Sequence, residues 1–256
     1  MVSKLTTYHI RRIALRQGYY ERKFCRKVGH PPDYDNPRTF TEKLAWMRLH
    51  DRNPLYPTLV DKIAVRDYVR ERVGEDILVP CYGVWDRPED IDFDSLPKSF
   101  VLKCNHESGF VIICKDKDEL DRTYVRAQLA TRLKMNFYYR FHEWPYKHVK
   151  PRILAEELLV DENGAEPHDY KTHCFGGQPG YTAVFIGRHT APKRGYYSPD
   201  WERMPFTGTT DPLRDVPRPP QLERMQEIIR ALAEGLRYCR VDLYVLTDRI
   251  YFVEIT

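Results

Sequence analysis

Residues 240–256, RVDLYVLTDRIYFVEIT, predict a β-hairpin that carries Asp242 on its first strand and Glu254 on its second. Val, Tyr, Phe and Ile dominate both runs, and such residues favour strands. Two carboxylates on neighbouring strands can hold a divalent cation such as Mg2+, which prefers oxygen ligands. Two solvated surface acids are the alternative, because most carboxylates in proteins are exposed.

The register of this hairpin decides between the two interpretations. Side chains alternate across a strand, so a shift by one residue moves a side chain to the other face. A three-residue loop at 247–249 sets Leu246 opposite Ile250. The same register sets Asp242 opposite Glu254 on one face. A two-residue turn separates the carboxylates, so the metal-site hypothesis requires the longer loop.

Composition restricts the class of protein. The chain has 256 residues, of which 42% are hydrophobic and 13% aromatic, enough for a substantial core. A mean hydropathy of -0.62 and the lack of a long apolar run exclude a membrane span, although peripheral contact with a membrane is compatible with them. The first residues, MVSKLTTYHIRRIALRQGYY, lack the apolar stretch of a signal peptide, so we expect a cytoplasmic protein.

Charge and cysteine content narrow the choice of partners. The net charge of +4 is spread along the chain without a basic block, which favours small anionic substrates over nucleic acid. The six cysteines form no CxxC pair, a pattern typical of reduced thiols rather than of a zinc site or a disulfide framework.

Hydrophobic periodicity predicts a helical beginning followed by mixed strands and helices. Helices are expected at 38–50, capped by Thr39 or Thr41, and at 59–74, 119–135 and 221–238. Strands are expected at 77–85, 99–106, 109–115, 152–160 and 170–189, the last interrupted by a turn at 176–179. Residues 189–220 are predicted to form a long polar loop.

A second candidate site follows the predicted strand that ends in SFVLKCNHESGF. Lys103 is close in sequence to Asn105, His106, Ser108 and Gly109. Small and polar residues after a strand let backbone N–H groups approach a phosphate, to which the lysine adds a positive charge. A strand lysine reaching solvent and a loop histidine bonded to backbone are the alternatives. The chain contains neither a GxxxxGK[ST] nor a GxGxxG motif, so a Walker-type or Rossmann site is not supported.

In order along the chain, NPRTFTEKLAWMRLHDRNPLY, VDKIAVRDYV, LPKSFVLKCNHESG, PRILAEELL, HDYKTHCFGGQP, RVDLY and YFVEIT resemble the ATP-grasp enzymes, and among them the TupA-like family named for teichuronopeptide biosynthesis. The resemblance covers nearly the whole chain. It implies an α+β fold of the ATP-grasp type, in which two α+β units clasp ATP. The expected division is a helical segment at 1–60, a central subdomain with the phosphate loop at 61–154, and a C-terminal subdomain with the hinge and metal site at 155–256.

The resemblance also implies roles for single residues. The expected nucleotide-binding residues are Lys62, Lys103, Asn105, His106, Ser108, Gly109, Glu156, Glu157, Leu159, Asp169 and Lys171. Among them, the Glu156 carboxylate and the backbone of Glu157 and Leu159 would contact adenine. Asp169 would contact the ribose. The expected catalytic residues near the triphosphate are Lys103, Lys171 and Arg188.

The resemblance makes the terminal hairpin a magnesium site with Asp242, Glu254 and Thr256 as ligands. The chain departs from the family pattern twice. Glu107 replaces the middle glycine of an NHGSG loop, and Thr256 stands where many ATP-grasp enzymes have asparagine. Because a strand that ends two residues after its ligand holds that ligand weakly, we expect either that the natural chain continues or that ATP and metal order this end.

The implied activity is an ATP- and Mg2+-dependent ligation of a carboxylate to an amine through an acylphosphate, with an acceptor such as a uronic acid in cell-surface polysaccharide biosynthesis. Acceptor recognition is expected from the loop at 189–220, where cations suit a carboxylate and aromatic rings suit a sugar. The residues concerned are His189, Lys193, Arg194, Tyr197 and Trp201.

Three other activities stay open. A phosphotransferase on the same fold would stop at the phosphorylated product. A nucleotide-sugar glycosyltransferase is suggested by the DxD pattern within DIDFD at 90–94, although these acids stand in a turn-like context. A non-catalytic nucleotide-binding protein is suggested by Glu107 and Thr256.

Overall fold

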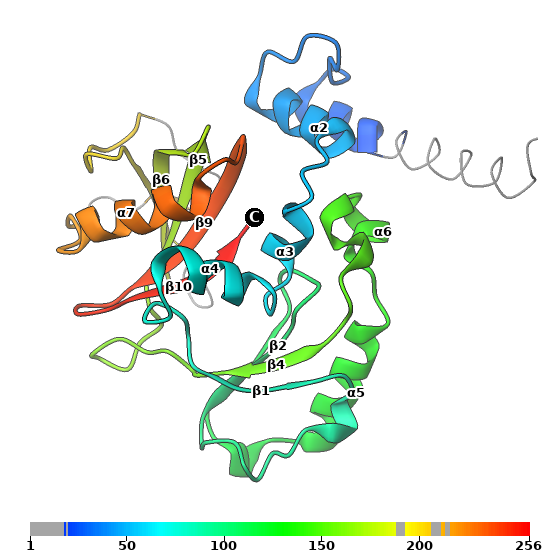
Figure 1. Cartoon of the computed structure of the whole chain (residues 1–256), viewed down its shortest axis with the longest axis vertical. Coiled ribbons are helices and arrows are strands. Elements are labelled where there is room, and N and C mark those ends of the chain that lie inside the picture. Colours follow the sequence, from blue (N-terminus) through cyan, green and yellow to red (C-terminus); the bar gives the residue numbers. More distant parts are fainter. Residues whose placement is uncertain (1–17, 19, 188–192, 206–210, 213–215) are drawn as a thin grey trace, which may run out of the picture. The chain divides into compact units, whose positions relative to one another are not determined.

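The computed structural model describes residues 18, 20–187, 193–205, 211–212 and 216–256, which form an α+β structure with two sheets (Figure 1). The chain divides into two compact units. The first contains residues up to Tyr56 together with Asn136–His148, and the second contains Pro57–Met135 together with Val149–Thr256. The division at 1–60, 61–154 and 155–256 stays a prediction.

The first unit is helical, as its sequence predicts. Helix α2 (Phe40–His50) begins with a capping box, in which the Thr39 side chain accepts from the Glu42 N–H and the Glu42 carboxylate accepts from the Thr39 N–H. A helix over residues 20–28, helix α6 (Phe137–Phe141) and the 3-10 helix η3 (Trp144–His148) also belong to this unit. Arg48 of α2 donates to the Phe141 carbonyl and ties α2 to α6.

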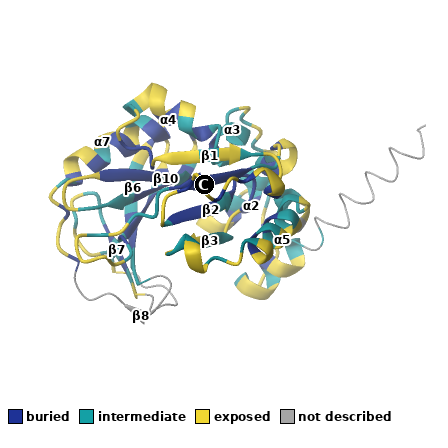
Figure 2. Ribbon diagram, turned by 90° about the horizontal axis from the view of Figure 1, so that it is seen from below, coloured by how far each residue is buried: buried dark blue, intermediate teal, exposed yellow. Residues whose placement is uncertain are grey.

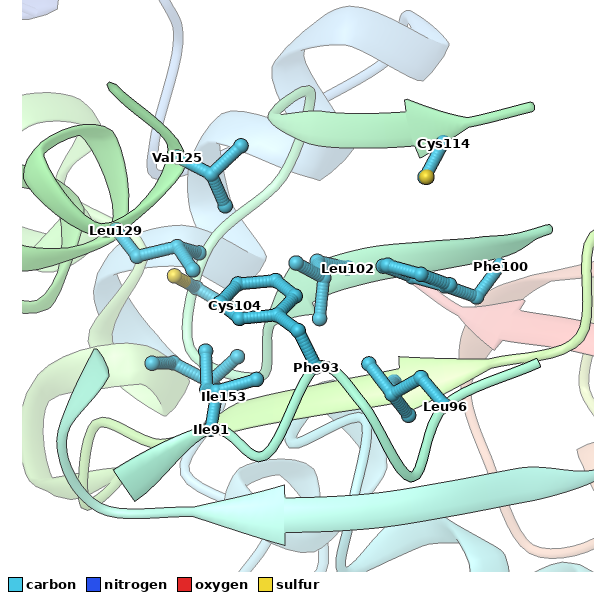
Figure 3. Close-up of a cluster of buried hydrophobic side chains, with 11 residues drawn as sticks. Ile91, Phe93, Leu96, Phe100, Leu102, Cys104, Cys114, Val125, Leu129 and Ile153 are labelled. Carbon is cyan, nitrogen blue, oxygen red and sulfur yellow. The ribbon is translucent and has the colours of Figure 1, made fainter. Parts of the chain in front are cut away.

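The smaller sheet of the second unit has the antiparallel order β1-β4-β2-β3. Its strands are β1 (Cys81–Trp85), β2 (Phe100–Cys104), β3 (Val111–Cys114) and β4 (Ile153–Glu156). Helix α5 (Arg122–Leu133) and the segment containing the 3-10 helix η1 (Pro88–Asp90) cover it; a second 3-10 helix, η2 (Lys117–Glu119), precedes α5. Figure 3 shows their shared core, in which Phe93, Leu102 and Leu129 pack together.

The larger sheet has the order β10-β9-β5-β6-β7-β8. Its strands are β5 (Asp169–Phe175), β6 (Gln178–Ile186), β7 (Lys193–Tyr197), β8 (Asp211–Pro212), β9 (Tyr238–Val245) and β10 (Ile250–Ile255). Helix α7 (Leu222–Ala233) covers one face with six buried side chains, and its exposed outer side is visible in Figure 2. The opposite face carries the charged residues of strands β5 and β9, and we call it the site face.

Two predicted elements differ from the structure. The helix expected at 59–74 is divided into α3 (Tyr56–Val60) and α4 (Val65–Val73). The Asp61 carboxylate causes the break, because it accepts from the N–H groups of Ile63 and Ala64 and so replaces helical hydrogen bonds. The loop expected at 189–220 contains strand β7, which pairs with β6.

The terminal hairpin pairs Asp242 with Glu254, but by another route than the predicted three-residue loop. Ile250 lies opposite Val245 rather than Leu246, so the loop is longer than expected. This register alone would set Asp242 opposite Val253. A β-bulge between Phe252 and Glu254 shifts the pairing by one residue and restores the facing carboxylates.

The structure agrees with the compositional predictions about membranes and thiols. Among the described residues, no helix combines the length and the apolar character that crossing a bilayer requires. All six cysteines are free thiols. Cys174 and Cys239 are cross-strand neighbours beneath α7, where burial and their mutual hydrogen bond suit unreactive core thiols.

The core of the smaller sheet gives a first testable prediction. Leu129 of α5 is fully buried in this core, so we expect Leu129→Ala to lower the free energy of unfolding by about 2–5 kcal/mol through lost burial and a cavity. Tyr124 lies on the same helix but is 61% exposed, so Tyr124→Ala should change it by less than about 0.5 kcal/mol. Urea denaturation of both variants measures the difference, and equal effects would contradict this packing.

Candidate nucleotide and metal site

The break between α3 and α4 positions Lys62. Its N–H donates to the Asn105 carbonyl at 3.2 Å, and its side chain donates to the Glu107 carbonyl. Its ammonium group also lies 3.9 Å from the carboxylate of Glu254. Burial lowers the pKa of Lys62, while Glu254 raises it. Lys62 therefore links the loop after β2 to the terminal hairpin.

Asn105 holds the first residue of the predicted phosphate loop in place. Its side chain is fully buried and donates to Asp61 at 2.8 Å and to the Lys150 carbonyl at 3.0 Å. Its side-chain oxygen accepts from the Arg152 N–H at 2.6 Å. A phosphate contact by this side chain, as expected from the resemblance, would require these bonds to break, so the structure favours a structural role.

The rest of this loop is divided between buried and exposed residues. His106 is buried, and its Nε2 lies 3.0 Å from the Met135 carbonyl. Burial lowers the pKa of His106, although hydrogen bonds raise it, so the ring is neutral near pH 7. Ser108 and Gly109 are exposed, and Gly109 has a φ of 86°, which favours glycine. Within the loop, these two residues offer the N–H groups nearest to solvent.

Glu107, which replaces a family glycine, points into the protein. Its side chain is 4% exposed, and its carboxylate lies 3.4 Å from Arg132. Burial raises the pKa of Glu107, while Arg132 and Lys62 lower it. The guanidinium of Arg132 also covers the ring of Phe110 at 4.3 Å. Because the carboxylate is paired and turned inward, it does not oppose an anion at the exposed part of the loop.

Glu156 closes the smaller sheet toward the predicted adenine hinge. Its carboxylate accepts from Lys103 at 2.7 Å and from Arg66 at 3.0 Å. The Glu157 N–H donates to the Pro80 carbonyl at 3.0 Å, so it is not the group that would read a base. Leu159 is partly exposed beyond it. The Glu157 carbonyl and the Leu159 backbone thus stay the expected contacts to adenine.

On the site face of the larger sheet, Lys171 lies between two carboxylates. Its ammonium group contacts Asp242 and lies 2.8 Å from Asp169. Asp242 is fully buried, and burial raises its pKa to about 6, against the lowering effect of Arg240 and Lys171. An ionised carboxylate without solvent access needs cations around it. Asp242 therefore requires a positive centre at this position.

The three expected metal ligands share one cationic partner. Nη2 of Arg240 lies 2.8 Å from Asp242, 3.1 Å from Glu254 and 3.1 Å from the Thr256 hydroxyl. Two backbone hydrogen bonds between Thr256 and Arg240 hold this end of β10. Three oxygens that surround one positive nitrogen fit a divalent cation, which prefers the same donors. Among the described residues, no group of three or more His, Cys, Asp or Glu side chains could hold a metal ion, so this candidate site depends on two carboxylates and one hydroxyl.

These contacts form two ion-paired groups, one beside the smaller sheet and one on the larger sheet, and Lys62 of the second group interacts electrostatically with Glu156 and Lys103 of the first; together we call them the charge network. Its nine members are Lys62, Arg66, Lys103, Glu156, Asp169, Lys171, Arg240, Asp242 and Glu254. Five cations against four carboxylates leave it one positive charge. Arg66 and Arg240 are not among the site residues predicted from the sequence. Arg240 could have been found, because it stands two residues before Asp242 in RVDLY and so shares its strand face.

The residues expected to recognise an acceptor are separated by the sheet. Lys193 and Tyr197 lie on the α7 side of β7, and Tyr197 is buried against Trp201 at 4.7 Å. Tyr197 therefore belongs to the core, Trp201 is partly buried beside it, and their expected role in acceptor recognition stays a prediction. Arg194 lies on the site face, over the ring of Phe185 at 4.2 Å. Arg188 and His189 lie outside the described residues.

The acids of DIDFD serve a turn. Asp90 pairs with Arg87, Asp92 caps the N–H groups of Asp94 and Ser95, and Asp94 pairs with Arg122. The intervening Ile91 and Phe93 enter the core. This arrangement accounts for the pattern without a metal.

Residues 42–256 match the family model described as TupA-like ATPgrasp, so the chain belongs to this family. Among curated proteins, none matches the sequence significantly.

Solved structures with a similar fold include three ATP-grasp proteins. D-alanine–D-alanine ligase from Bacillus anthracis, complexed with ATP, is 20% identical to this chain with a TM-score of 0.45. The match covers 78% of this chain and 53% of that ligase. The ATP-grasp ligase PsnB, complexed with minimal precursor, Mg and ADP, is 15% identical with a TM-score of 0.41; the match covers 83% of this chain and 56% of PsnB. A RimK domain protein ATP-grasp from Sphaerobacter thermophilus DSM 20745 is 16% identical with a TM-score of 0.43; the match covers 77% of this chain and 58% of that protein. The chain spans little more than half the length of these proteins.

The structural role of Asn105 can be tested by stability. Asn105→Ala leaves buried partners such as the Arg152 N–H unsatisfied, so we expect it to lower the free energy of unfolding by about 2–4 kcal/mol. Ser108→Ala, at an exposed position of the same loop, should change it by less than about 0.5 kcal/mol without ligand. Chemical denaturation of the ligand-free protein measures both. A stable Asn105→Ala protein would mean that this side chain serves a ligand instead.

Glu107 gives a prediction about pH. An acid with a raised pKa in the folded state loses stability as pH rises through that pKa, because the unfolded state ionises more readily. Glu107→Gln should therefore be more stable than the natural protein near pH 8, and the difference should shrink toward about pH 4. Denaturation midpoints across this range test it, with exposed Glu89→Gln as a control. Lower stability of Glu107→Gln near pH 8 would show that the Arg132 pair outweighs burial.

Proposed function

We propose that this chain is an ATP- and Mg2+-dependent ligase that joins a carboxylate to an amine through an acylphosphate. It would act in the cytoplasm on a precursor of a cell-surface polysaccharide, with a uronic acid as the favoured acceptor. The family and the charge network support the proposal. The observation that carries it is the convergence of Asp242, Glu254 and Thr256 on one cationic nitrogen of Arg240.

Under this proposal, Asp242, Glu254 and Thr256 hold Mg2+. Bound there, the metal would supply positive charge to the phosphate oxygens of ATP. Its two carboxylates are now neutralised by Arg240, Lys171 and Lys62, so a bound metal would need the phosphates of ATP to balance the added positive charge. The release of Arg240 from these oxygens is the rearrangement that metal binding demands.

The lysines and the hinge would hold the nucleotide. Lys62 and Lys103 are half-buried ammonium groups whose present partners are carboxylates, Glu254 and Glu156. Phosphate oxygens can replace these partners, because they accept the same charge-assisted hydrogen bonds. Glu156 would then accept from the adenine amino group, with Arg66 keeping the carboxylate oriented. The exposed backbone at Ser108 and Gly109 would cover the phosphates.

The chemistry follows from moving one phosphoryl group. An acceptor carboxylate oxygen attacks the γ-phosphorus of ATP, and the bond from this phosphorus to the β-phosphate oxygen breaks. ADP is the leaving group, and the acceptor becomes an acylphosphate. The amine attacks the acyl carbon, phosphate leaves, and an amide remains after the nitrogen loses a proton. Lys103, Lys171 and Arg188 are the expected cations for the transferring group. Excluding water protects the acylphosphate from hydrolysis.

Hydroxylamine provides a test that does not require the natural amine. It converts an acylphosphate into a hydroxamate and releases phosphate. With ATP, Mg2+ and a panel of uronic acids and amino acids, we expect hydroxamate to form together with ADP for at least one carboxylate. Formation of ADP and a stable phosphorylated product without hydroxamate would support the phosphotransferase instead.

Variants of the hairpin identify the metal site through thermal stabilisation by ATP. Asp242→Asn and Glu254→Gln should lose most Mg2+-dependent stabilisation by ATP, whereas Asp248→Asn, an exposed acid in the loop of the same hairpin, should keep it. A ligand at 100 times its dissociation constant adds about 2.7 kcal/mol, so melting temperatures with and without Mg2+ resolve the loss. Unchanged ATP stabilisation in both site variants would contradict the assignment. Mg2+-dependent ATP turnover that persists in both site variants would also contradict the assignment.

A further inference from the structure

The site face of the larger sheet continues past Lys171 and Arg240 into a group of aromatic side chains. We call this group the aromatic shelf; its members are His173 and Phe175 on β5, Tyr181 on β6 and Tyr238 on β9. His173 is the cross-strand neighbour of Arg240. The shelf thus adjoins the cationic end of the charge network.

The four rings contact one another closely. His173 stacks on Tyr181 with 4.4 Å between ring centroids and 16° between planes, and its Nδ1 lies 2.9 Å from the Tyr238 hydroxyl. Phe175 lies 5.5 Å from Tyr238 and 6.3 Å from Tyr181. Phe175 is 42% exposed, and the other three rings are half-buried. Solvent therefore reaches an aromatic surface that the proposed binding of ATP does not use.

The order of residues along β5 places the shelf relative to the nucleotide. Asp169, Lys171, His173 and Phe175 follow one another on the site face. Each step of two residues advances the strand by roughly 6.5–7 Å. If Asp169 contacts the ribose and Lys171 the triphosphate, the next positions lie beyond the phosphates. That is where the acceptor of the γ-phosphoryl group must bind.

The shelf is uncharged beside a cation. Burial, together with Arg240 and Lys171, lowers the pKa of His173 to about 4, so its imidazole is neutral at pH 7. Neutral ring faces with phenol hydroxyls suit a ligand that has an apolar C–H face and hydroxyl edges. The guanidinium of Arg240 suits a carboxylate on the same ligand. A pyranose ring with a carboxylate has all three features, whereas an aliphatic amino acid lacks the hydroxyl edges.

We propose that the aromatic shelf binds the pyranose ring of a uronic acid acceptor, with the acceptor carboxylate directed toward Arg240. This inference rests on the proposed ligase function and adds the site of acceptor recognition. Phe175 and Tyr181 provide the stacking surface, and Tyr238 positions His173 through its hydroxyl. When Asp242 and Glu254 hold a metal, Arg240 becomes available to the carboxylate.

Gly180 keeps the exposed ring of the shelf in place. A Cβ atom at this position would lie 2.7 Å from Phe175 Cδ2, so any larger residue must move the ring. Gly180→Ala therefore displaces Phe175 without removing an aromatic group. It provides a second variant that depends on the shelf geometry alone.

The test measures binding of methyl β-D-glucuronide, a uronic acid locked as a pyranose, with Mg2+ and a non-hydrolysable ATP analogue present. Saturation-transfer NMR and calorimetry should show contact through the ring C–H groups and tighter binding than methyl β-D-glucoside, which lacks the carboxylate. Phe175→Ala, Tyr181→Ala and Gly180→Ala should each raise the dissociation constant roughly two- to tenfold, since an aromatic contact contributes on that scale. Tyr124→Ala, an exposed aromatic on α5, should leave it unchanged.

Each result decides the proposal. Unchanged affinity in all three shelf variants, each with a cooperative melting transition, overturns it, as does equal binding of the glucuronide and the glucoside. Loss of binding in the shelf variants but not in Tyr124→Ala supports it. The hydroxylamine assay keeps the two proposals apart. Hydroxamate formed from another carboxylate, without glucuronide binding, contradicts the proposed acceptor site but not the ligase function. Glucuronide binding without any ATP-dependent hydroxamate contradicts the ligase function instead.

Discussion

The buried charge of Asp242 constrains the rest of this structure. A carboxylate without solvent exposure is stable as an anion only with close cations, and Arg240 and Lys171 provide them. Those cations need counter-charges of their own, which come from Glu254 and Asp169. The alternation of charge then extends across the site face. Such an arrangement is weak evidence for stability, because charge burial offsets much of the attraction. It is better understood as a preformed site whose charges can exchange partners.

The connection between the two sheets depends on a short break in a helix. Asp61 ends the helical hydrogen bonding after α3 and accepts from the Asn105 side chain. Lys62 is thereby fixed between the loop after β2 and Glu254 of β10. The N–H of Phe252 donates to the Ile77 carbonyl at 2.7 Å, which adds a second link between β10 and the segment before β1. The helix break at Asp61, which the sequence pattern places in the middle of a helix, thus positions Lys62 next to the carboxylate of Glu254.

The resemblance to ATP-grasp proteins predicted the fold, whereas the roles of the site residues stay predictions and the contacts among them could not be predicted from sequence. Alternation and cross-strand pairing identified Asp242 and Glu254 as facing residues, yet the bulge at Val253 replaced the expected loop, because many combinations of loop and bulge give the same pairing. The helical pattern at 59–74 does not indicate that Asp61 accepts from backbone N–H groups. In the fold, the same carboxylate also accepts from Asn105, a contact that is distant in sequence. The Gly and Pro residues of 189–220 hide the short strand that ends at Tyr197. Tyr197 is buried against Trp201, which in turn contacts Tyr170, and no local sequence pattern contains these tertiary contacts.

The inward position of Glu107 changes what its departure from the family glycine means. At a loop tip, an acid would repel the phosphates and stiffen the backbone. Here the carboxylate pairs with Arg132, which leaves the exposed turn to Ser108 and to Gly109 with its positive φ. The carbonyl of Glu107 accepts from Lys62, so the residue acts on the site through its backbone rather than through its charge. If a phosphate replaces Glu254 as the partner of Lys62, as proposed, this carbonyl would keep the lysine in place. The substitution is thus compatible with nucleotide binding because the side chain and the backbone of one residue face opposite environments.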